Sequence, residues 1–403
     1  MGLFVRYRGF RWLFAGQLLS QLGNAVFLVM GLWEIQLRSP VLLAVAGFAM
    51  VVPRLLAAFG GVLADRYNSA RLMLYTDIAR GVAVAIGLVA LIAPGGLVPA
   101  VIGLLAVNSL GDALFTPAEA IVIPRLVDPG DLVAANGVYS LTFQVSSAVG
   151  SALGGAAIAA VGVAAVFGFD LGTFWISALA IALMLRTFAP RSPARAAGQP
   201  PEEQGFRSSL REGMAAVRKL PIVMTLLPLV ILGNFTFMIA FTMLPFWVRH
   251  SLHAGAATYG LVDAAWAVGL ILGGVATTVI KNWSTRAASA IAFGIQALIT
   301  LAFAASTVPW LSAALFLVGG AMNGVGNALL LTVLQRLIPE EVRGRVFGMV
   351  GALFTLANPL GAVTAGLLLH AVPLFLPWVL AGATGLAFAV GLWRTVPVDF
   401  SPS

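Results

Sequence analysis

Residues 60–71 read GGVLADRYNSAR, and a long apolar run stands on each side of this short polar stretch. The stretch holds one acid, two arginines and residues that favour turns, whereas its flanks are apolar enough to lie in lipid. The same alternation extends along the chain of 403 residues, of which 60% are hydrophobic and only 9% are charged. Because soluble domains carry about 25% charged residues, this chain needs lipid as a solvent, and the sequence predicts an integral membrane protein.

Twelve apolar runs follow one another, and most of the connectors between them are short. Each run is long enough for a spanning helix, which needs about 20 residues, and far longer than a barrel strand of about 10 residues. The pattern therefore predicts an all-α membrane protein with twelve transmembrane helices. These predicted helices lie near residues 11–37, 41–64, 72–93, 98–121, 134–160, 164–186, 221–248, 257–280, 287–305, 309–334, 344–370 and 374–394.

The basic residues predict the orientation in the membrane. Nineteen of the 23 Lys and Arg lie at the two chain ends or in every second connector, and only Arg38 and Arg249 lie on the opposite side. Positive residues are enriched on the cytoplasmic side, so we expect both termini in the cytoplasm and the chain in the inner (plasma) membrane. Because the basic residues are spread over short loops, the net charge of +8 indicates attraction to membrane lipids and no nucleic-acid partner.

The chain also contains an internal repeat. The triplet GGV occurs at residues 60–62 and again at 273–275, and residues 124–155 align with 335–366 at an offset of 211 residues. Two matching blocks at nearly equal offset predict a duplicated unit of six helices. At the same offset Asp112 corresponds to Asn323, so only one of the two halves carries an acid at this position.

The duplication predicts the domain organisation. Residues 1–186 are expected to form an N-terminal six-helix bundle and residues 221–403 a C-terminal six-helix bundle. The segment between them, 187–220, is rich in Pro, Gly and charge, which is typical of a linker, and its expected place is the cytoplasm. Within it, the sequence FRSSLREGMAAVRKL at 206–220 predicts a short amphipathic helix on the membrane surface.

The opening stretch resembles the loop signature Gly-x-x-x-Asp-Arg-x-Gly-Arg of the major facilitator superfamily. The matching positions are Gly61, Asp65, Arg66 and Arg71, and Asn68, which tolerates a left-handed turn, stands where the family usually has Gly. The segments LFAGQLLSQLGNAVF and ALFTPAEAIVIPRLV are similar to those of its twelve-helix drug:proton antiporters, a group with macrolide and enterobactin exporters. The resemblance implies two pseudo-symmetric six-helix bundles that rock around a midplane site.

The resemblance also implies a gating latch at this loop. The family's acid meets the cytoplasmic start of helix 11, which here carries Arg343 and Arg345. Asp65, with the other residues of the motif, is therefore expected to face these arginines when the cytoplasmic side is closed. The alternative is a local salt bridge within the turn, which contributes about 0–1 kcal/mol when exposed.

Charged residues inside the apolar runs are functional candidates, because burying a charge in a bilayer costs at least about 2.5–3.5 kcal/mol. Asp112 is the preferred proton-coupling residue: beside the apolar Phe115, it is expected to bind a proton on one side and release it on the other. Arg54 is its expected partner, in alternation with the proton, and Glu119 is a secondary candidate, expected to act as a relay toward the cytoplasm. A permanent structural salt bridge between Asp112 and Arg54 is the alternative.

The other charged residues in the runs have simpler interpretations. Asp77 and Arg80 are three residues apart on one predicted helix and are expected to form a structural charge pair. Glu34, Asp170 and Asp263 lie near the outer ends of their runs and are expected to be wetted.

Polar residues recur at helical spacing on predicted helices 1, 4, 7 and 10, which line the central cavity in the superfamily. Residues three or four apart share a helix face, so each set forms a stripe. The expected substrate cavity is lined by Gln17, Gln21, Asn24, Asn108, Phe115, Asn234, Met238, Phe241, Asn323 and Asn327. The alternative for any one amide is a hydrogen bond between helices, which contributes about 0.6 kcal/mol.

These patterns predict a secondary active transporter, a proton-coupled exporter of hydrophobic or amphipathic small molecules such as drugs. A siderophore or metabolite exporter and a lysolipid flippase are alternatives within the same fold, and so is an importer, because the fold does not set the direction. An intramembrane enzyme is disfavoured, since the three histidines form no zinc motif and no phosphate-binding loop is present. We expect no catalytic residue, metal or cofactor, and a monomer.

Overall fold

The computed structural model describes residues 2–38, 41–53, 60, 63–64, 66–187, 221–277, 285–338, 346, 360–369 and 371–396. The predicted linker at 187–220 lies outside these ranges apart from its first residue. Five residues to which the sequence assigns roles also lie outside them: Arg54, Gly61, Asp65, Arg343 and Arg345.

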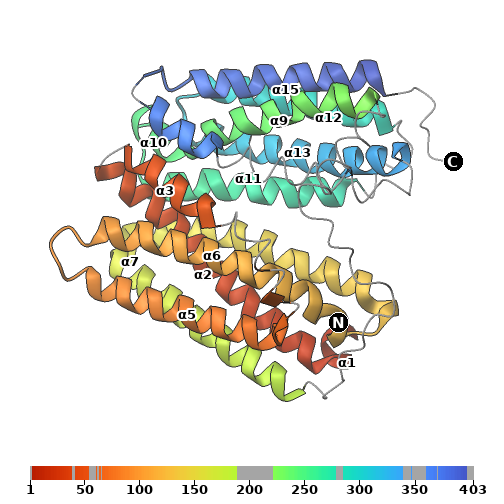
Figure 1. Cartoon of the computed structure of the whole chain (residues 1–403). Coiled ribbons are helices and arrows are strands. Elements are labelled where there is room, and N and C mark those ends of the chain that lie inside the picture. The colour runs from red at the N-terminus through yellow and green to blue at the C-terminus, as the bar shows by residue number, and fades with distance from the viewer. Residues whose placement is uncertain are drawn as a thin grey trace. The chain divides into compact units, whose positions relative to one another are not determined.

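By its internal contacts the chain divides into two compact units, and the first comprises Met1–Ser192 and His253–Ala264. The helices of this first unit are α1 (Gly2–Arg6), α2 (Arg8–Arg38), α3 (Val41–Val51), α5 (Ser69–Ala90), α6 (Leu97–Leu126) and α7 (Leu132–Thr187), with a 3-10 turn at Pro129–Asp131 (Figure 1).

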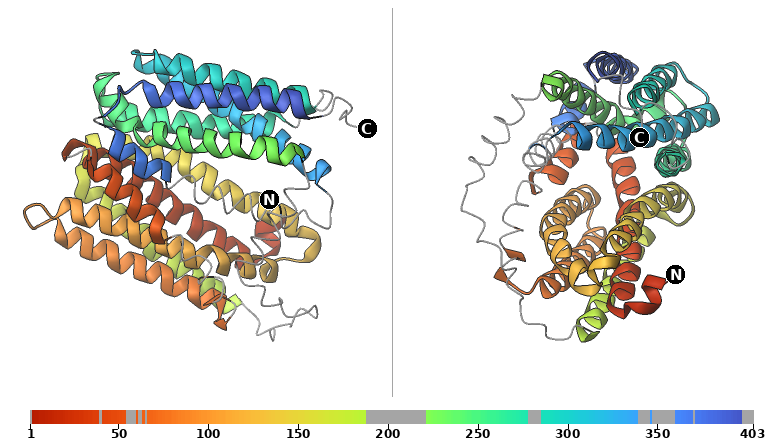
Figure 2. Two further views of the ribbon diagram at one scale, coloured as in Figure 1. Left: turned by 45° about the horizontal axis from the view of Figure 1, so that its top comes forward. Right: turned by 90° about the vertical axis from the view of Figure 1, so that its right-hand side faces the viewer.

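The second unit comprises Pro193–Leu252 and Ala265–Ser403. Its helices are α9 (Pro221–Thr242), α10 (Leu244–His250), α11 (Ala256–Ala276, whose first residues belong to the first unit), α12 (Thr285–Ala304), α13 (Pro309–Leu337) and α15 (Leu376–Thr395). The right-hand view of Figure 2 shows that the helices of each unit pack side by side as a bundle. No strand occurs in the ranges that the structure describes, and the all-α fold class is confirmed.

Nine helices in the described ranges are long and apolar enough to span a membrane. The longest, α7, is interrupted at Gly162, where φ is 78° and ψ is 177°, a backbone conformation that glycine adopts readily. This break lies between the helices predicted at 134–160 and 164–186. The helices predicted at 41–64 and 344–370 fall partly outside the described residues, so the total of twelve stays a prediction.

The helix predicted at 221–248 is divided in the structure. α9 and α10 meet at a turn at Met243. Pro245 explains the break, because proline has no N–H to donate to the carbonyl of Phe241 one turn earlier. An apolar run alone therefore predicts the length of this segment but not its interruption.

Glycines at seven-residue intervals bring α2 close to the second segment of α7. A Cβ on Gly16 would lie 2.9 Å from the Cβ of Ala180, and a Cβ on Gly23 would lie 2.2 Å from Thr173 Oγ1. Gly9, one interval earlier, faces the end of α7 in the same way. Small residues at such a seam let helix backbones approach closely in a membrane, and here they place the polar groups of α7 against α2.

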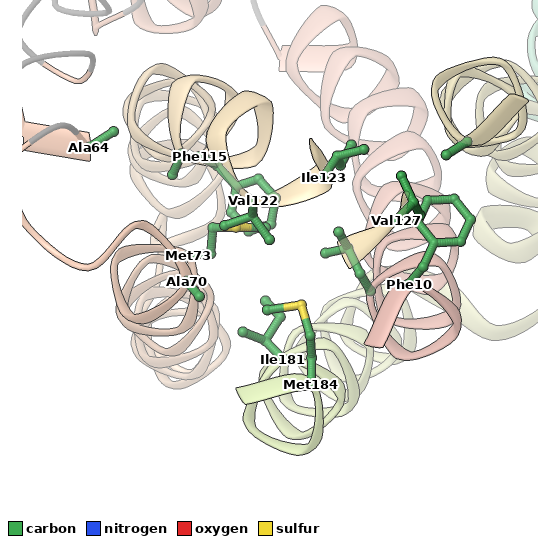
Figure 3. Close-up of a cluster of buried hydrophobic side chains, with 13 residues drawn as sticks. Phe10, Ala64, Ala70, Met73, Phe115, Val122, Ile123, Val127, Ile181 and Met184 are labelled. Carbon is green, nitrogen blue, oxygen red and sulfur yellow. The ribbon is translucent and has the colours of Figure 1, made fainter. Parts of the chain in front are cut away.

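Each unit has its own apolar core. Buried side chains from α2, α5, α6 and α7 form a cluster in the first unit that includes Phe10, Leu13, Met73, Phe115, Ile181 and Met184 (Figure 3). The second unit has a cluster that includes Leu226, Phe293, Val333, Phe388 and Leu392. Apolar side chains also cover the outside: Ile86 and Val89 on α5 are 65% and 66% exposed, as expected of a surface that faces lipid.

Candidate functional site

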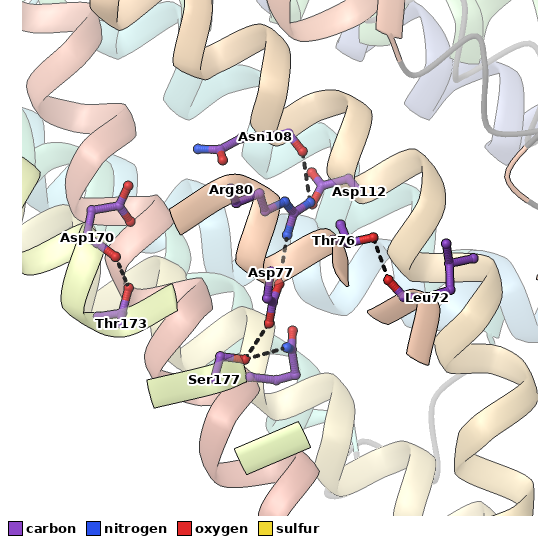
Figure 4. Close-up of polar contacts among 10 residues, drawn as sticks. Leu72, Thr76, Asp77, Arg80, Asn108, Asp112, Asp170, Thr173 and Ser177 are labelled. Atoms are coloured by element: carbon purple, nitrogen blue, oxygen red, sulfur yellow. Dashed lines mark hydrogen bonds and ion pairs between the residues drawn. The ribbon is translucent and has the colours of Figure 1, made fainter. Parts of the chain in front are cut away.

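An ion pair joins α5 to α6 inside the first unit. The guanidinium of Arg80 donates from Nη2 to Asp112 Oδ1 over 2.7 Å and to the backbone oxygen of Asn108 over 2.9 Å (Figure 4). The side chain of Arg80 is 2% exposed, whereas that of Asp112 is 35% exposed. The arginine is therefore enclosed by protein, and its acidic partner is partly accessible.

A second acid, Asp77, contacts the other terminal nitrogen of Arg80. Asp77, fully buried on α5, places Oδ1 at 3.8 Å from Arg80 Nη1 and accepts a hydrogen bond of 2.6 Å from Ser177 Oγ on α7 (Figure 4). Gln17 on α2 donates to the same Ser177 hydroxyl over 3.1 Å. Four helices thus contribute to one buried polar network.

The surroundings of Arg80 are apolar and closely fitted. The rings of Phe115 and Phe174 lie 5.9 Å and 5.8 Å from its guanidinium carbon, within the range of a cation–π contact. Gly111 on α6 makes room for the side chain, because a Cβ there would lie 2.0 Å from Arg80 Nε. Phe115, predicted as a cavity residue, is instead buried in the core of the unit.

Two carboxylates therefore share one guanidinium in a low-dielectric setting. If Asp77 and Asp112 are both ionised, this cluster carries a net charge of −1, and one bound proton neutralises it. The sequence predicted a pair of Asp77 with Arg80 and a separate role for Asp112, and the structure joins Arg80 to both acids.

A cavity of about 170 Å³ in the first unit opens beside Asp112. Its polar lining comes from three helices, and the residues are Gln21, Asn24, Asn108, Ser109, Asp112 and Ser147. Gln17, predicted on the same stripe as Gln21, is buried against Ser177. The Ser109 hydroxyl is bonded to the backbone oxygen of Met50 on α3.

The second unit contains a larger cavity of about 560 Å³, within the range of about 300–1,000 Å³ typical of ligand sites. Most of its lining is apolar, with aromatic side chains from Phe237, Trp266, Phe293 and Phe388 and amides from Asn234, Gln296, Asn323 and Asn327. Two further predicted residues, Met238 and Phe241, lie on α9 outside the lining: Met238 packs at Gly361, and Phe241 stacks on Phe237 at 5.8 Å.

The amides of this cavity form a chain from α13 to α12. Asn327 Nδ2 donates to Asn323 Oδ1 over 2.8 Å, and Asn323 Nδ2 donates to Gln296 Oε1 over 3.3 Å. Asn234 Nδ2 donates to the Val230 carbonyl of its own helix. Gln296 was not predicted as a cavity residue, although it is the only amide in the apolar run 287–305 and could have been found on that ground.

Other acids in the first unit have partners or are fully enclosed. Glu119 lies close to Tyr139 of α7, and Glu34 pairs with Arg38 at 2.6 Å. The expectation that Asp170 is wetted is wrong: it is 0% exposed, because α2 approaches α7 so closely at Gly23. Among the described residues, neither Asp170 carboxyl oxygen has a hydrogen-bond partner.

Three further acids of this unit make hydrogen-bonded contacts away from the cluster. Asp263 accepts a hydrogen bond from Ser151. On the loop between α6 and α7, Asp128 and Asp131 both pair with Arg6, at 2.8 Å and 2.9 Å. These contacts leave Asp112 as the acid that both touches the buried arginine and lines a cavity.

The last four residues of the opening stretch, 68–71, form the start of α5. Asn68 has φ −68° and ψ 106°, and its Oδ1 accepts a hydrogen bond of 3.1 Å from Arg71 N. It is therefore an N-cap, and the left-handed turn that the motif allowed does not form there. Arg66 and Arg71 are exposed. The latch to Arg343 and Arg345 stays a prediction, since those residues and Asp65 are not described.

Fold and composition together define an all-helical, multi-pass membrane protein. The chain matches the family model described as Major Facilitator Superfamily over residues 13–362 and 231–402, and it belongs to that family.

Relatives with efflux functions share most of its length. Macrolide efflux protein A of Streptococcus pyogenes is 25% identical and covers 89% of this chain and 88% of its own. Multidrug efflux pump Tap of Mycolicibacterium fortuitum is 27% identical, with 90% and 91% covered. The structure of a bacterial homologue of the iron transporter ferroportin, in an inward-facing state, matches with a TM-score of 0.70 at 17% identity over 96% of this chain and 98% of that one, which shows the fold.

Proposed function

We propose that this transporter is a proton-coupled exporter, an antiporter that moves hydrophobic or amphipathic small molecules by alternating access. The observation that carries the proposal is the Arg80–Asp112 ion pair, in which a buried arginine holds an acid that lines a cavity. A charged group inside a membrane helix is costly, and its position at a cavity gives protons a route to it.

The anchoring of Arg80 favours Asp112 as the acid that exchanges protons. Arg80 is held by Asp77 and by the Asn108 carbonyl, and Asp77 is itself held by Ser177. When Asp112 binds a proton, Arg80 therefore keeps two partners and the cluster becomes neutral. This arrangement also fits the expected role of Asp77 and Arg80 as a structural pair, whereas Arg54 stays a predicted alternative partner.

The large cavity of the second unit supports the proposed substrate class. Its lining is mostly apolar, with aromatic faces and a few amides, a composition typical of sites for small organic ligands. The efflux relatives are named for macrolides and for multiple drugs, which favours export of drug-like compounds over a siderophore, metabolite or lysolipid. In this proposal the protein acts as a monomer in the inner membrane, with cytoplasmic termini and two six-helix halves.

Dye uptake into everted membrane vesicles tests the proposal. Vesicles with an acidic lumen should accumulate a lipophilic fluorescent dye, and a protonophore should abolish the accumulation. The Asp112→Asn variant should lose gradient-driven accumulation and keep downhill equilibration of the dye. Asp128→Asn, which changes an exposed acid on a loop, serves as the matched control and should behave as wild type.

Two outcomes would contradict the proposal. Accumulation that persists after the proton gradient has collapsed would exclude proton coupling. Gradient-driven accumulation that is undiminished in Asp112→Asn would exclude Asp112 as the coupling residue.

A further inference from the structure

The cavity of the second unit is uncharged throughout its described lining. None of the described residues around it is an Asp, Glu, Lys, Arg or His. The apolar runs predicted in the second half contain a single acid, Asp263, and this residue is bonded to Ser151 and does not line the cavity. A ligand in this cavity therefore meets no countercharge among the residues that the structure describes.

The amide chain has a direction. Asn327 donates to Asn323, and Asn323 donates to Gln296. These bonds occupy the carbonyl oxygens of Asn323 and Gln296 as acceptors. Within the described part of the chain, the Gln296 Nε2 group is left as a donor and the Asn327 Oδ1 atom as an acceptor, so the two ends of the chain differ.

Two aromatic pairs line the same cavity as these amides. The rings of Phe237 and Trp266 lie 4.9 Å apart, and those of Phe293 and Phe388 lie 5.0 Å apart. All four residues line the cavity. Such faces offer a planar apolar group a large contact area, while the amides offer it a fixed hydrogen-bonding partner.

We propose that this cavity selects uncharged ligands that join an aromatic or other apolar body to a strong hydrogen-bond acceptor, which Gln296 binds through Nε2. The inference rests on the proposed function in taking this cavity as a substrate site, and it names the class of substrate. An organic cation of the same size would lose its hydration without gaining a counterion from the described lining, and burial of an unpaired charge is strongly unfavourable. A neutral acceptor loses much less and gains the hydrogen bond.

Two probes of similar shape separate these cases. Triphenylphosphine oxide is uncharged and carries a strong acceptor oxygen, whereas tetraphenylphosphonium is a cation without an acceptor. Equilibrium dialysis with the purified full chain in lipid nanodiscs, and with empty nanodiscs as the blank, measures both affinities. We expect the oxide to bind at least about tenfold more tightly than the cation. Equal or tighter binding of the cation overturns the proposal.

Substitutions of Gln296 test the role of its amide group. Gln296→Met keeps the length of the side chain and removes the donor, so affinity for the oxide should fall about 3–10-fold, as expected for one hydrogen bond. Gln296→Glu places an acid in the cavity and should shift the preference toward the cation. Unchanged oxide affinity in Gln296→Met, or an unchanged preference in Gln296→Glu, overturns the assignment.

A control variant separates these effects from general damage. Thr384 is bonded to Thr236 in the same unit at 2.9 Å and does not line the cavity. Thr384→Val should therefore leave the ratio of the two affinities unchanged. Because binding is measured without a proton gradient, loss of antiport and loss of ligand selectivity are separate results, and each can fail while the other holds.

Discussion

Two neighbouring helices in each unit are joined by a polar contact, and the two contacts differ in charge. In the first unit Arg80 on α5 donates to Asp112 on α6 over 2.7 Å. In the second unit Asn323 on α13 donates to Gln296 on α12 over 3.3 Å. Asp112 and Asn323 correspond at the offset of 211 residues that relates the two halves of the sequence. The corresponding position is therefore ionisable in one unit and neutral in the other.

The cavities beside the two contacts differ in size. The cavity at Asp112 measures about 170 Å³, and the cavity at Asn323 measures about 560 Å³. A buried charge requires close partners on several sides, which leaves little open space, whereas neutral amides tolerate an open apolar chamber. In the proposed function the first unit binds and releases the proton, and the second unit binds the substrate.

The largest loss of stability is expected on removal of Arg80, the cation that Asp77 and Asp112 share. Arg80→Gln leaves Asp77 and Asp112 without their countercharge, and such an uncompensated buried charge costs about 3–5 kcal/mol in free energy of unfolding. The triple variant Arg80→Gln, Asp77→Asn, Asp112→Asn makes the network as neutral as that of the second unit. It should regain stability to within about 1 kcal/mol of wild type, as measured by unfolding in mixed micelles.

Arg71→Gln is the matched control for this series, because Arg71 is an exposed arginine on the same helix. Its effect on the free energy of unfolding should stay within about 0.5 kcal/mol. Equal instability of the single and the triple variant would show that the loss comes from packing around Arg80 rather than from the uncompensated acids.

Much of the fold is predictable because a membrane helix must satisfy its backbone within itself. Apolar runs therefore mark the helices, and the break at Gly162 lies between two predicted runs. The turn at Met243 was not predicted, although Pro245 two residues later gives its cause. The burial of Asp170 was also not predicted, because it depends on the close approach of Gly23 from another helix.

The candidate site is predictable only in part. Helical spacing suffices to place Asn108 and Asp112 on one face of α6. The partner of Asp112 is set by how α5 packs on α6, over a separation of 32 residues, and no local pattern encodes that distance. The sequence therefore predicted Arg54 as the partner of Asp112 and a pair of Arg80 with Asp77. The structure joins Arg80 to both Asp77 and Asp112.

Adding a charge to the second unit tests whether its neutral amides are needed for stability. Asn323→Asp introduces a carboxylate opposite a neutral Gln296, and the free energy of unfolding should fall by about 2.5–3.5 kcal/mol. Adding Gln296→Arg supplies a partner like that of Asp112 and should restore most of the loss. Both values come from the same unfolding measurement. If the single variant is as stable as wild type, the second cavity tolerates a charge and the contrast between the units is weaker than proposed.

A smaller loss of stability is expected on substitution of Gly111, the residue of α6 that leaves space for the Arg80 side chain. Gly111→Ala places a Cβ 2.0 Å from Arg80 Nε, so the guanidinium must move, at a cost of about 1–3 kcal/mol. Gly103→Ala on the same helix meets nothing within 4 Å and should be neutral or stabilising by up to about 1 kcal/mol. Thermal unfolding of the two variants compares them directly. Equal melting temperatures would mean that Arg80 can shift freely.

The smallest effect is expected at a second arginine that also binds two aspartates. Arg6 pairs with Asp128 and Asp131 at 2.8 Å and 2.9 Å, but its side chain is 62% exposed. Water solvates these groups in either state, so Arg6→Gln should change the free energy of unfolding by only about 0–1 kcal/mol. Arg6→Gln and Arg80→Gln both remove an arginine that contacts two aspartates. The two sites differ in burial, so the difference between the two losses measures the effect of burial. A loss as large as that at Arg80 would mean that burial is not what makes the α5–α6 cluster sensitive to its charge.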